Sequence, residues 1–340
     1  MEFIDEQSFG VQMLSNSTFL ITGGTGSFGN TLVSHLLKTD VSEIRIFSRD
    51  ESKQHYMKQS IQDERVRFFL GDVRNFDSVS HAVQGADYVF HAAALKHVPA
   101  GELFPWEFTQ TNIGGSHNLL RAIESSSVQR AVFLSTDKAV YPVNAMGMTK
   151  AMMEKLVRSS NYSTSSVNLI TRYGNVIGSR GSVIPQFISS LQKFGRVQVT
   201  NLEMTRFMMS LEDSVSLVLF ALENGTPGDL FVQKAPGASV ESIVGALALL
   251  LKVKNPEIEI VGVRPGEKIH ETLLTAEEKF RSIEHDNFFQ VSNVGNHDSI
   301  KSNMQNLTAN EYSSNTTVQL SSKELAELLS GIPLIQDLIR

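Results

Sequence analysis

The sequence predicts an α/β protein with a doubly wound parallel sheet, followed by a smaller α/β lobe. Short apolar runs alternate with helical stretches through the first half of the chain, and a glycine turn joins the first apolar run to the first helix. Buried parallel strands joined by crossover helices have this pattern, so the larger unit is Rossmann-like. The regularity loosens after residue 175, where we expect the smaller lobe to begin.

The elements of the larger unit follow in order along the chain. We expect strands near residues 18–21, 43–47, 66–70, 88–91, 131–134 and 167–171, and helices over 30–37, 77–83, 111–125 and 148–159. Each strand-helix-strand step adds a parallel neighbour to one sheet. Residues 178–206 show no such pattern, while a helix at 240–251 and a short strand at 257–261 belong to the second lobe.

These elements divide the chain into an N-terminal arm at 1–16, a first domain at 17–175, a second lobe at 176–290 and a C-terminal segment at 291–340. A later strand near 215–235 is expected to return to the first domain. The C-terminal segment combines a helix with a polar stretch rich in Asn and Ser. Such a stretch is either flexible or ordered only against another subunit.

Composition narrows the classes of function. The formal net charge is −6 with scattered Lys and Arg, which argues against nucleic acid as the main partner. There is no cysteine and no HxxxH or HxH cluster, so we expect no disulfide and no metal site. No apolar run approaches the ~20 residues that span a membrane, and the first residues lack signal-peptide order, so we expect a soluble, cytoplasmic protein.

A glycine-rich loop follows the first strand. The segment TGGTGSFG, residues 22–29, opens the first helix. Glycines let the backbone turn tightly and approach a pyrophosphate held by the amides of a helix N-terminus. The loop therefore predicts a dinucleotide site in the first domain, although its GxxGxxG spacing differs from the commoner GxGxxG. The predicted contacts are Gly23, Thr25, Gly26, Ser27, Phe28 and Gly29.

The end of the second strand selects the dinucleotide. Ser48 and Arg49 offer a hydroxyl and a guanidinium there, and Lys53 follows closely. These groups suit a 2′-phosphate, which favours NADP over NAD; alternatively, Asp50 binds the ribose hydroxyls. The predicted contacts of this region are Ser48, Arg49, Asp50, Lys53 and, at the adenine edge after the third strand, Asp72 and Val73.

The most informative stretch runs from residue 134 to residue 150. It begins at the C-terminal end of a strand, where open α/β sheets bind ligands, and it ends in a helix on which positions 146 and 150 share a face. Thr136, Asp137 and Lys138 follow one another at the strand end. A hydroxyl, a carboxyl group and an amine are therefore expected together at the site.

Long segments in a fixed order carry a family resemblance. Besides TGGTGSFG, they are FSRDESKQ (47–54), GDVR (71–74), HAAALKHVP (91–99), TNIGG (111–115), STDKA (135–139), RYGNVIGSRGSVIP (172–185), MTRFMM (204–209) and VRPGEKIHETL (263–273). The chain resembles an extended short-chain dehydrogenase/reductase from about residue 18 to 280. Within that superfamily it resembles the inverting UDP-N-acetylglucosamine 4,6-dehydratases of capsule, O-antigen and flagellar glycan biosynthesis.

The resemblance implies an NADP-dependent reaction on UDP-N-acetylglucosamine or a close UDP-sugar. In this family a hydride leaves sugar C4, water is lost across C5 and C6, and the hydride returns at C6. Thr136 matches the hydroxyl that holds the C4 oxygen, while Asp137 and Lys138 match the acid and the base of the elimination. Retaining dehydratases carry Asp-Glu at this place, so Lys138 implies inversion at C5.

The acid and the base make opposite demands on two pKa values. A lysine base must be partly neutral near pH 7, so its pKa must fall from ~10.4, whereas an aspartic acid donor needs a pKa above ~3.9. Adjacent ions stabilise each other and oppose both shifts. Burial with substrate bound, or a shared proton, must then supply the difference.

One position departs from the superfamily pattern. Its YxxxK motif is here Met146 to Lys150, and methionine cannot exchange the C4 proton. Either the site is inactive, or another group such as Tyr141 substitutes, or this is an active branch that dispenses with the tyrosine. We favour the last two, and Lys150 is still expected to bind the nicotinamide ribose.

The matching segments imply further contacts. Those for the cofactor are Ala92, Ala93, Asn112, Lys150 and Tyr173, and those for the UDP-sugar are Lys96, His97, Asn175, Ser182, Val183, Thr205, Arg206, Arg264 and Glu267. The guanidinium groups of Arg206 and Arg264 suit a pyrophosphate. The resemblance also suggests a homo-oligomer, a hexamer. Two rival functions stay open: a UDP-sugar 4-epimerase, and a catalytically silent nucleotide-sugar or NADP-binding subunit.

Overall fold

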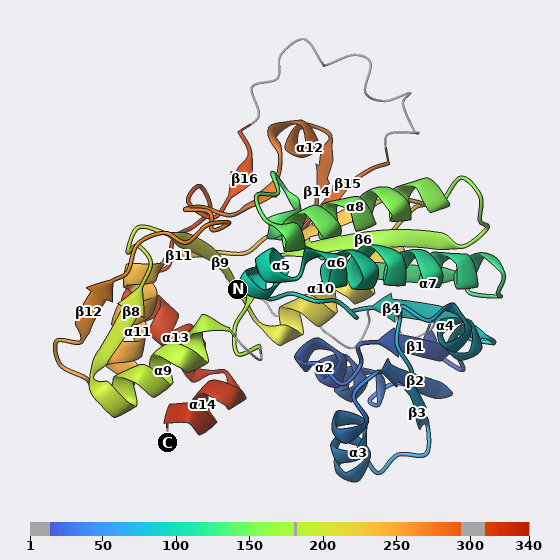
Figure 1. The fold of residues 1–340 in the computed structure, drawn as a ribbon, viewed down its shortest axis with the longest axis horizontal. Helices are drawn as coiled ribbons and strands as arrows, with labels where there is room; N and C mark the ends of the chain where they lie inside the picture. The colour runs from blue at the N-terminus through green and yellow to red at the C-terminus, as the bar shows by residue number, and fades with distance from the viewer. Residues whose placement is uncertain (1–13, 180–181, 294–309, 340) are drawn as a thin grey trace.

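The first domain is built around a large twisted sheet (Figure 1). The computed structural model describes residues 14–179, 182–293 and 310–339. The sheet strands are β1 (Thr18–Thr22), β2 (Glu43–Ser48), β3 (Val66–Leu70), β4 (Tyr88–His91), β5 (Arg130–Thr136), β6 (Val167–Tyr173), β10 (Leu230–Gln233), β14 (Ser282–Glu284) and β15 (Phe288–Val291). These short runs are rich in apolar residues, and β4 and β10 are buried throughout.

The order of the strands is β14-β15-β10-β6-β5-β4-β1-β2-β3. Neighbours from β3 to β10 pair in parallel, whereas β15 runs antiparallel to β10 and to β14. The order 3-2-1-4-5-6 within it is that of doubly wound dinucleotide-binding sheets. The predicted fold class is therefore confirmed.

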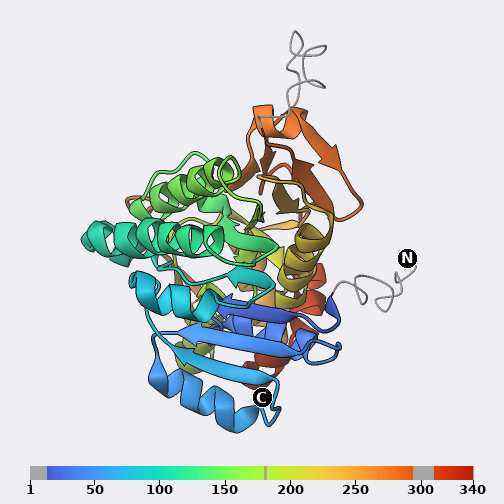
Figure 2. The same ribbon diagram turned by 90° about the vertical axis from the view of Figure 1, so that its right-hand side faces the viewer.

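Helices cover both faces of the sheet (Figure 2). Buried side chains of α2 (Ser27–Leu36), α3 (Glu51–Ser60) and α10 (Leu211–Asn224) share one core with the sheet. Those of α4 (Phe76–Val83), α7 (Gly115–Glu124) and α8 (Ala145–Ser160) share another. Two short helices, α5 (Val98–Leu103) and α6 (Pro105–Phe108), and the π-helix η1 (Thr109–Gly114) lead into α7.

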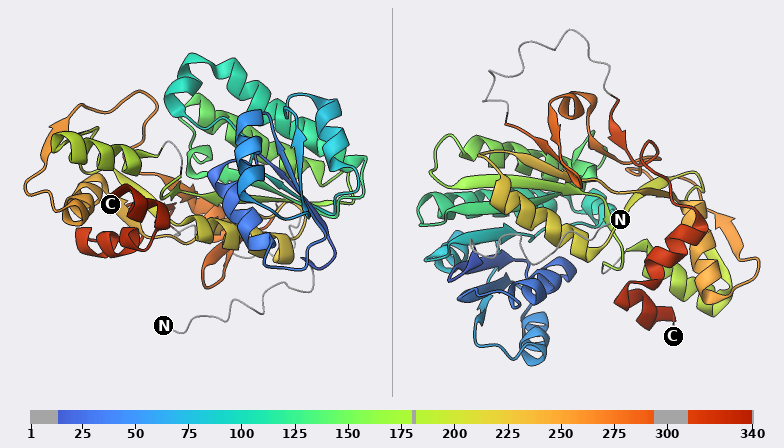
Figure 3. Two further views of the ribbon diagram at one scale, coloured as in Figure 1. Left: turned by 90° about the horizontal axis from the view of Figure 1, so that it is seen from below. Right: turned by 180° about the vertical axis from the view of Figure 1, so that it is seen from behind.

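The second lobe lies beside the large sheet and has a core of its own (Figure 3). Its elements are α9 (Val183–Phe194), α11 (Val240–Leu251), α13 (Ser322–Ser330), α14 (Pro333–Ile339) and the parallel pair β8 (Arg196–Val199) and β12 (Glu257–Ile260). Two small sheets join the lobe to the large domain. They are β11 (Gly237–Ser239) with β9 (Thr205–Met209) and β7 (Asn175–Val176), and β13 (Thr272–Leu274) with β16 (Tyr312–Ser313).

Several elements differ from the sequence-based expectations. Residues 178–206, expected to be irregular, contain α9 and β8, because Ile184, Ile188 and Leu191 make one apolar helix face that packs in the second core. The strand expected near 215–235 occupies only 230–233, and α10 precedes it. The helix α3 was not expected because its exposed face is polar. Residues 1–13 of the predicted arm and 294–309 of the predicted C-terminal segment lie outside the described residues.

Candidate active site

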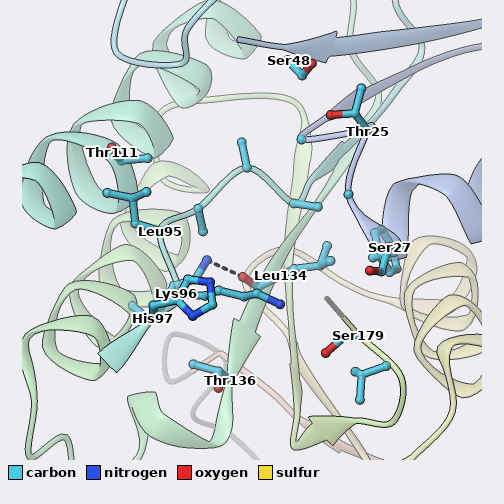
Figure 4. A pocket seen from close by; sticks show the side chains of 18 of the residues that line it. Thr25, Ser27, Ser48, Leu95, Lys96, His97, Thr111, Leu134, Thr136 and Ser179 are labelled. Atoms are coloured by element: carbon cyan, nitrogen blue, oxygen red, sulfur yellow. Dashed lines mark hydrogen bonds between the residues drawn. The ribbon is translucent and has the colours of Figure 1, made fainter. Parts of the chain in front are cut away.

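A cavity of about 710 Å³ opens at the carboxyl ends of the parallel strands, where β1 and β4 lie side by side and the strand order reverses. Open α/β sheets bind their ligands at this point. In Figure 4, Ser48 and Thr25 lie at one end of the cavity, and Lys96, His97 and Thr136 lie toward the other. The cavity thus connects the glycine loop with the turn that follows β5.

Two glycines of the loop allow close approaches of the backbone. Gly23 has φ +70°, and a Cβ there would lie 2.8 Å from the backbone nitrogen of Ala93. A Cβ on Gly29 would lie 2.2 Å from the carbonyl oxygen of Gly24. The helix α2 begins after Gly26, and no side chain caps it. Its first amides are therefore suited to a phosphate, since helix N-termini leave their first N–H groups without intrahelical partners.

The end of β2 presents a guanidinium to the cavity. Asp50 is the N-cap of α3, where its carboxylate accepts a hydrogen bond from the backbone N–H of Lys53. The same carboxylate forms an ion pair with Lys53 Nζ at 2.7 Å. These contacts with Lys53 lower the pKa of Asp50. Arg49 also lines the cavity with a half-exposed side chain, and its nearest carboxylate, on Asp72, is 4.0 Å away. Arg49 is thus more loosely paired than Asp50.

Buried polar residues hold the loop that follows β4. His91 lies between Thr22 Oγ1, 2.7 Å from its Nδ1, and Ser116 Oγ, 2.9 Å from its Nε2. Burial lowers the pKa of His91 to about 3, so the ring is neutral at physiological pH. Asn112 does not line the cavity; its side-chain amide binds both backbone groups of Leu95, at 2.8 and 3.0 Å. His91 and Asn112 therefore support the loop after β4 from beneath the cavity surface, without lining the cavity themselves.

The turn after β5 brings three functional side chains together. Thr136 Oγ1 donates to Asp137 Oδ1 at 2.8 Å, and Lys138 Nζ lies 3.0 Å from the same oxygen. Asp137 and Lys138 form the 3₁₀ turn η2 (Asp137–Ala139), and α8 packs closely on it. A Cβ on Gly147 would lie 2.2 Å from the carbonyl oxygen of Lys138, so this contact requires a residue without a side chain.

The lysine of this turn is held as a cation. Burial by itself lowers the pKa of Lys138, but attraction from Asp137 and Glu271 outweighs it and leaves the pKa above its ordinary value. Glu271 Oε1 is 3.4 Å from Lys138 Nζ. The structure therefore opposes the lowered lysine pKa that a base requires, in the direction expected for neighbouring ions.

The residues at the YxxxK positions both line the cavity. Met146 is buried, and Lys150 Nζ donates to the carbonyl oxygen of Leu134 at 2.6 Å. Burial lowers the pKa of Lys150 to about 8, and Glu154 opposes this shift. Tyr141, considered as a substitute for the missing tyrosine, is 54% exposed and lies outside the cavity lining.

Most predicted cofactor residues line this one cavity. They are Gly23, Thr25, Gly26, Ser27, Phe28, Ser48, Arg49, Asp50, Lys53, Asp72, Val73, Ala92, Ala93, Lys150 and Tyr173. Four predicted substrate residues also line it, namely Lys96, His97, Asn175 and Ser182. The predicted catalytic residues Thr136, Lys138 and Met146 do so as well, while Asp137 is fully buried behind Lys138.

The remaining predicted substrate residues lie outside the cavity lining. Val183 begins α9, and Thr205 and Arg206 lie on β9. Arg264 and Glu267 lie in the loop before β13, and 63% of the Arg264 side chain is exposed. In this conformation the second lobe therefore contributes less to the cavity than we expected.

Several residues at the site were given no role from sequence. Ser135 Oγ donates to Glu154 Oε1 at 2.5 Å, and Arg172 pairs with both Glu154 and Glu278. Glu271 contacts Lys138. The segments STDKA, RYGNVIGSRGSVIP and VRPGEKIHETL contain Ser135, Arg172 and Glu271, but only the fold reveals their partners.

Two kinds of feature are absent from the part of the chain that the structure describes. Among residues 14–179, 182–293 and 310–339, no group of three or more His, Cys, Asp or Glu side chains is arranged to hold a metal ion. Within the same ranges, no helix has the length and apolar character needed to cross a membrane.

Known proteins are similar to this chain over almost its whole length. The family described as polysaccharide biosynthesis protein matches residues 19–293. A protein from Rickettsia bellii strain RML369-C, named UDP-glucose 4-epimerase, is 44% identical over 96% of this chain and 98% of its own. A protein of the same name from Rickettsia typhi strain Wilmington is 42% identical over the same shares.

Solved structures are similar as well. The X-ray structure of Pen from Bacillus thuringiensis is 33% identical, with a TM-score of 0.86 over 94% of this chain and 99% of that one. The dTDP-glucose 4,6-dehydratase DesIV from Streptomyces venezuelae, with NAD and TYD bound, is 23% identical. Its TM-score is 0.68 over 74% of this chain and 86% of its own, a likeness of fold.

Proposed function

Since the chain belongs to the polysaccharide biosynthesis protein family, within the extended short-chain dehydrogenase/reductases, we propose that it is an NADP-dependent UDP-N-acetylglucosamine 4,6-dehydratase that inverts C5. The product would be a UDP-2-acetamido-2,6-dideoxy-4-hexulose for surface polysaccharides. The observation that carries this proposal is the Thr136–Asp137–Lys138 turn at the cavity. A 4-epimerase needs no acid–base pair beyond C4, whereas an elimination across C5 and C6 requires one.

The residues present fit a dinucleotide. Glycines at 23 and 29 let the loop pack directly on the backbone of Ala93 and Gly24, and the uncapped N-terminus of α2 faces the cavity, where its free amides suit a pyrophosphate. A bound nicotinamide dinucleotide would supply the hydride acceptor and donor. Lys150 would bind its ribose, and Arg49 would bind the 2′-phosphate, because Asp50 is engaged by Lys53.

The Asp137–Lys138 pair can cycle its protons without a net change. When substrate closes the site, one proton passes from the Lys138 ammonium to the Asp137 carboxylate, 3.0 Å away. The neutral amine then takes the C5 proton, and the carboxylic acid protonates the C6 hydroxyl, which leaves as water. Lys138 ends the elimination as an ammonium and Asp137 as a carboxylate, which is the ion pair seen in the structure. Oxidation at C4 releases the C4 hydroxyl proton to solvent, and after the hydride returns at C6 the enolate takes one proton from solvent at C5, on the opposite face of the ring.

This cycle reconciles the raised lysine pKa with a role as a base. In the free protein Lys138 is better ionised, because attraction to the neighbouring carboxylates outweighs burial. In a site closed to water, a neutral pair costs less than two separated charges. The proton transfer therefore supplies the base and the acid together.

The experiment that tests the proposal follows the product from UDP-N-acetylglucosamine and NADP. We expect the loss of one water by mass spectrometry. In deuterated water, NMR should show deuterium at C5 of an inverted product. An isomer of unchanged mass without deuterium at C5 would instead establish the second candidate, a UDP-sugar 4-epimerase. The Rickettsia relatives, named UDP-glucose 4-epimerase, favour this candidate. Binding of both ligands without any product would indicate a silent subunit.

Removal of the proposed base should abolish the elimination. Lys138→Met keeps much of the side-chain volume but removes the amine. We expect kcat to fall by about 10²- to 10⁴-fold, the usual contribution of a general acid or base. Lys58→Met, on the exposed surface of α3, is the matched control and should keep wild-type kcat. Wild-type turnover by Lys138→Met would refute the assignment of the base.

A further inference from the structure

A second buried carboxylate contacts the proposed base. Glu271 is 3% exposed and lies immediately before β13. Its Oε1 is 3.4 Å from Lys138 Nζ, while Asp137 Oδ1 is 3.0 Å from the same nitrogen. The amine of Lys138 therefore lies between two buried carboxylates that come from distant parts of the chain.

The segment that carries Glu271 is fixed onto the catalytic turn and the helix after it. Asn144 Nδ2, at the N-cap of α8, donates to the carbonyl oxygen of Gly266 at 2.8 Å. Lys268 Nζ donates to the carbonyl oxygen of Val140, one residue after η2. With the contact between Glu271 and Lys138, residues 266–271 meet the stretch 138–144 at three points.

The backbone of Glu271 is also fixed from its other side. Its N–H donates to Ser314 Oγ at 2.9 Å, and its carbonyl oxygen accepts from the Ser314 N–H at 2.7 Å. Ser314 Oγ lies 2.6 Å from Thr205 Oγ1 as well. Ser314 from the C-terminal part of the chain thus holds the backbone of Glu271 in place. The Glu271 carboxylate therefore starts from a fixed point when it contacts Lys138.

The charges around Glu271 account for its burial. Arg206 Nε lies 4.0 Å from Oε1, and Lys268 Nζ lies 3.8 Å from Oε2. Among the described residues, Glu271 Oε2 and Asp137 Oδ2 accept no hydrogen bond. Three cations, Lys138, Arg206 and Lys268, therefore face two carboxylates. Without these cations a buried carboxylate would be strongly destabilising.

We infer that Glu271 is a positioning residue for Lys138, and this inference rests on the dehydratase function proposed above. By sharing the ammonium with Asp137, Glu271 holds the amine at the cavity wall. Glu271 still holds the Lys138 amine at the cavity wall after one proton has passed from Lys138 to Asp137. It then stabilises the ammonium that forms when Lys138 takes the C5 proton, so its role is exerted through Lys138 and not on the substrate.

The pH dependence follows from the groups that face Lys138. These are Asp137 on the same turn, Glu271 before β13 and Arg206 on β9; Lys268 is nearby, and α8 packs on the turn through Gly147. Burial lowers the pKa of Lys138, Asp137 and Glu271 raise it, and Arg206 lowers it. Neutralising Glu271 removes one of the raising interactions. Lys138 should then lose its proton at a lower pH than in the wild type.

The test compares Glu271→Gln with the wild type as full-length chains. NMR of ε-labelled lysine, with the Lys138 signal assigned by its absence in Lys138→Met, should show a Lys138 pKa lower by about one unit. We expect kcat to fall about tenfold or more, with KM for the UDP-sugar changed less than about twofold. The basic limb of the kcat profile should move to lower pH, because the Asp137–Lys138 pair must keep one proton for the transfer.

Two further variants complete the test. Glu271→Asp keeps the charge on a shorter side chain, so the Lys138 pKa should stay above that of the Gln variant and kcat should be partly restored. Glu257→Gln, on the exposed strand β12, should match the wild type in every measurement. If Glu271→Gln does not fold, Glu271→Asp decides: a kcat equal to the wild type overturns the inference.

The outcomes separate the inference from the function on which it rests. An unchanged Lys138 titration in a folded Glu271→Gln protein overturns the role of Glu271, whatever the reaction is. A wild-type protein that releases no water from the UDP-sugar overturns the dehydratase function. In that case the inference falls too, even if the titration still reports the contact between Glu271 and Lys138.

Discussion

The two walls of the cavity are held by different kinds of contact. On the cofactor side, close backbone approaches at Gly23 and Gly29 set the loop after β1. On the opposite side, long charged side chains set the turn after β5, where Lys138 meets Glu271. The contact at Gly29 forms within a local strand-turn-helix unit, and that at Gly23 reaches Ala93 at the end of a neighbouring strand. The contact of Lys138 with Glu271 instead requires a segment from far along the chain to pack on the turn.

This difference explains how well each wall could be predicted. A glycine that allows a close approach is recognisable from its place between a strand and a helix. A buried ion pair leaves no local pattern, because its partners are distant along the chain and each residue taken alone resembles a surface charge. On the substrate side, accordingly, only the structure revealed the buried ion pairs of Glu271 and Arg172.

The largest effect that we expect on ligand binding tests the cofactor wall. In Gly29→Ala the new Cβ would lie 2.2 Å from the carbonyl oxygen of Gly24, so α2 must shift away from the loop. Overpacking of this kind costs about 1–3 kcal/mol or more, so we expect NADP affinity to fall by about a hundredfold and Tm to drop. Calorimetric titration and thermal unfolding measure the two effects.

A matched glycine variant serves as the control for this prediction. Gly114→Ala, also at a helical glycine, has its nearest atom 3.9 Å from the new Cβ and should bind NADP normally. Equal affinity of the two variants would mean that close packing at Gly29 does not shape the cofactor site.

A smaller effect should separate NADP from NAD. Arg49→Ala removes the guanidinium at the cavity rim while leaving the Asp50–Lys53 pair in place. A hydrogen bond to a charged group contributes about 1.5–3 kcal/mol, so we expect NADP affinity to fall about 10- to 100-fold. NAD affinity should change little. A parallel loss for both dinucleotides would show that Arg49 supports the loop without reading the 2′-phosphate.

The smallest effect concerns the second lobe. Arg264 is exposed and lies 4.0 Å from Glu267, outside the cavity lining. Exposed ion pairs contribute at most about 1 kcal/mol, so Arg264→Ala should raise KM for the UDP-sugar by less than about fivefold in steady-state assays. An increase of a hundredfold would show that the second lobe closes over the substrate and brings Arg264 onto it. Both walls of the cavity would then contribute strongly to ligand binding.

Much of the site was predictable because it follows the strand ends. The glycine loop, Arg49 after β2 and Thr136 at the end of β5 all line one cavity, as parallel strands require. The second lobe was less predictable. The helix α9 begins within a Gly- and Ser-rich stretch, and α13 packs on α11 although dozens of residues separate them in the chain.

The sequence by itself determined the doubly wound sheet, the dinucleotide loop and the Thr136–Asp137–Lys138 triplet, because periodicity and local motifs encode them. Only the tertiary structure decided the direction in which the pKa of Lys138 shifts. Glu271 and Arg206 reach Lys138 from the small sheets that join the two parts of the chain, and Glu271 outweighs Arg206 in its effect on the lysine pKa. Electrostatic interactions depend on distance and burial, and both arise when segments far apart in the chain pack together.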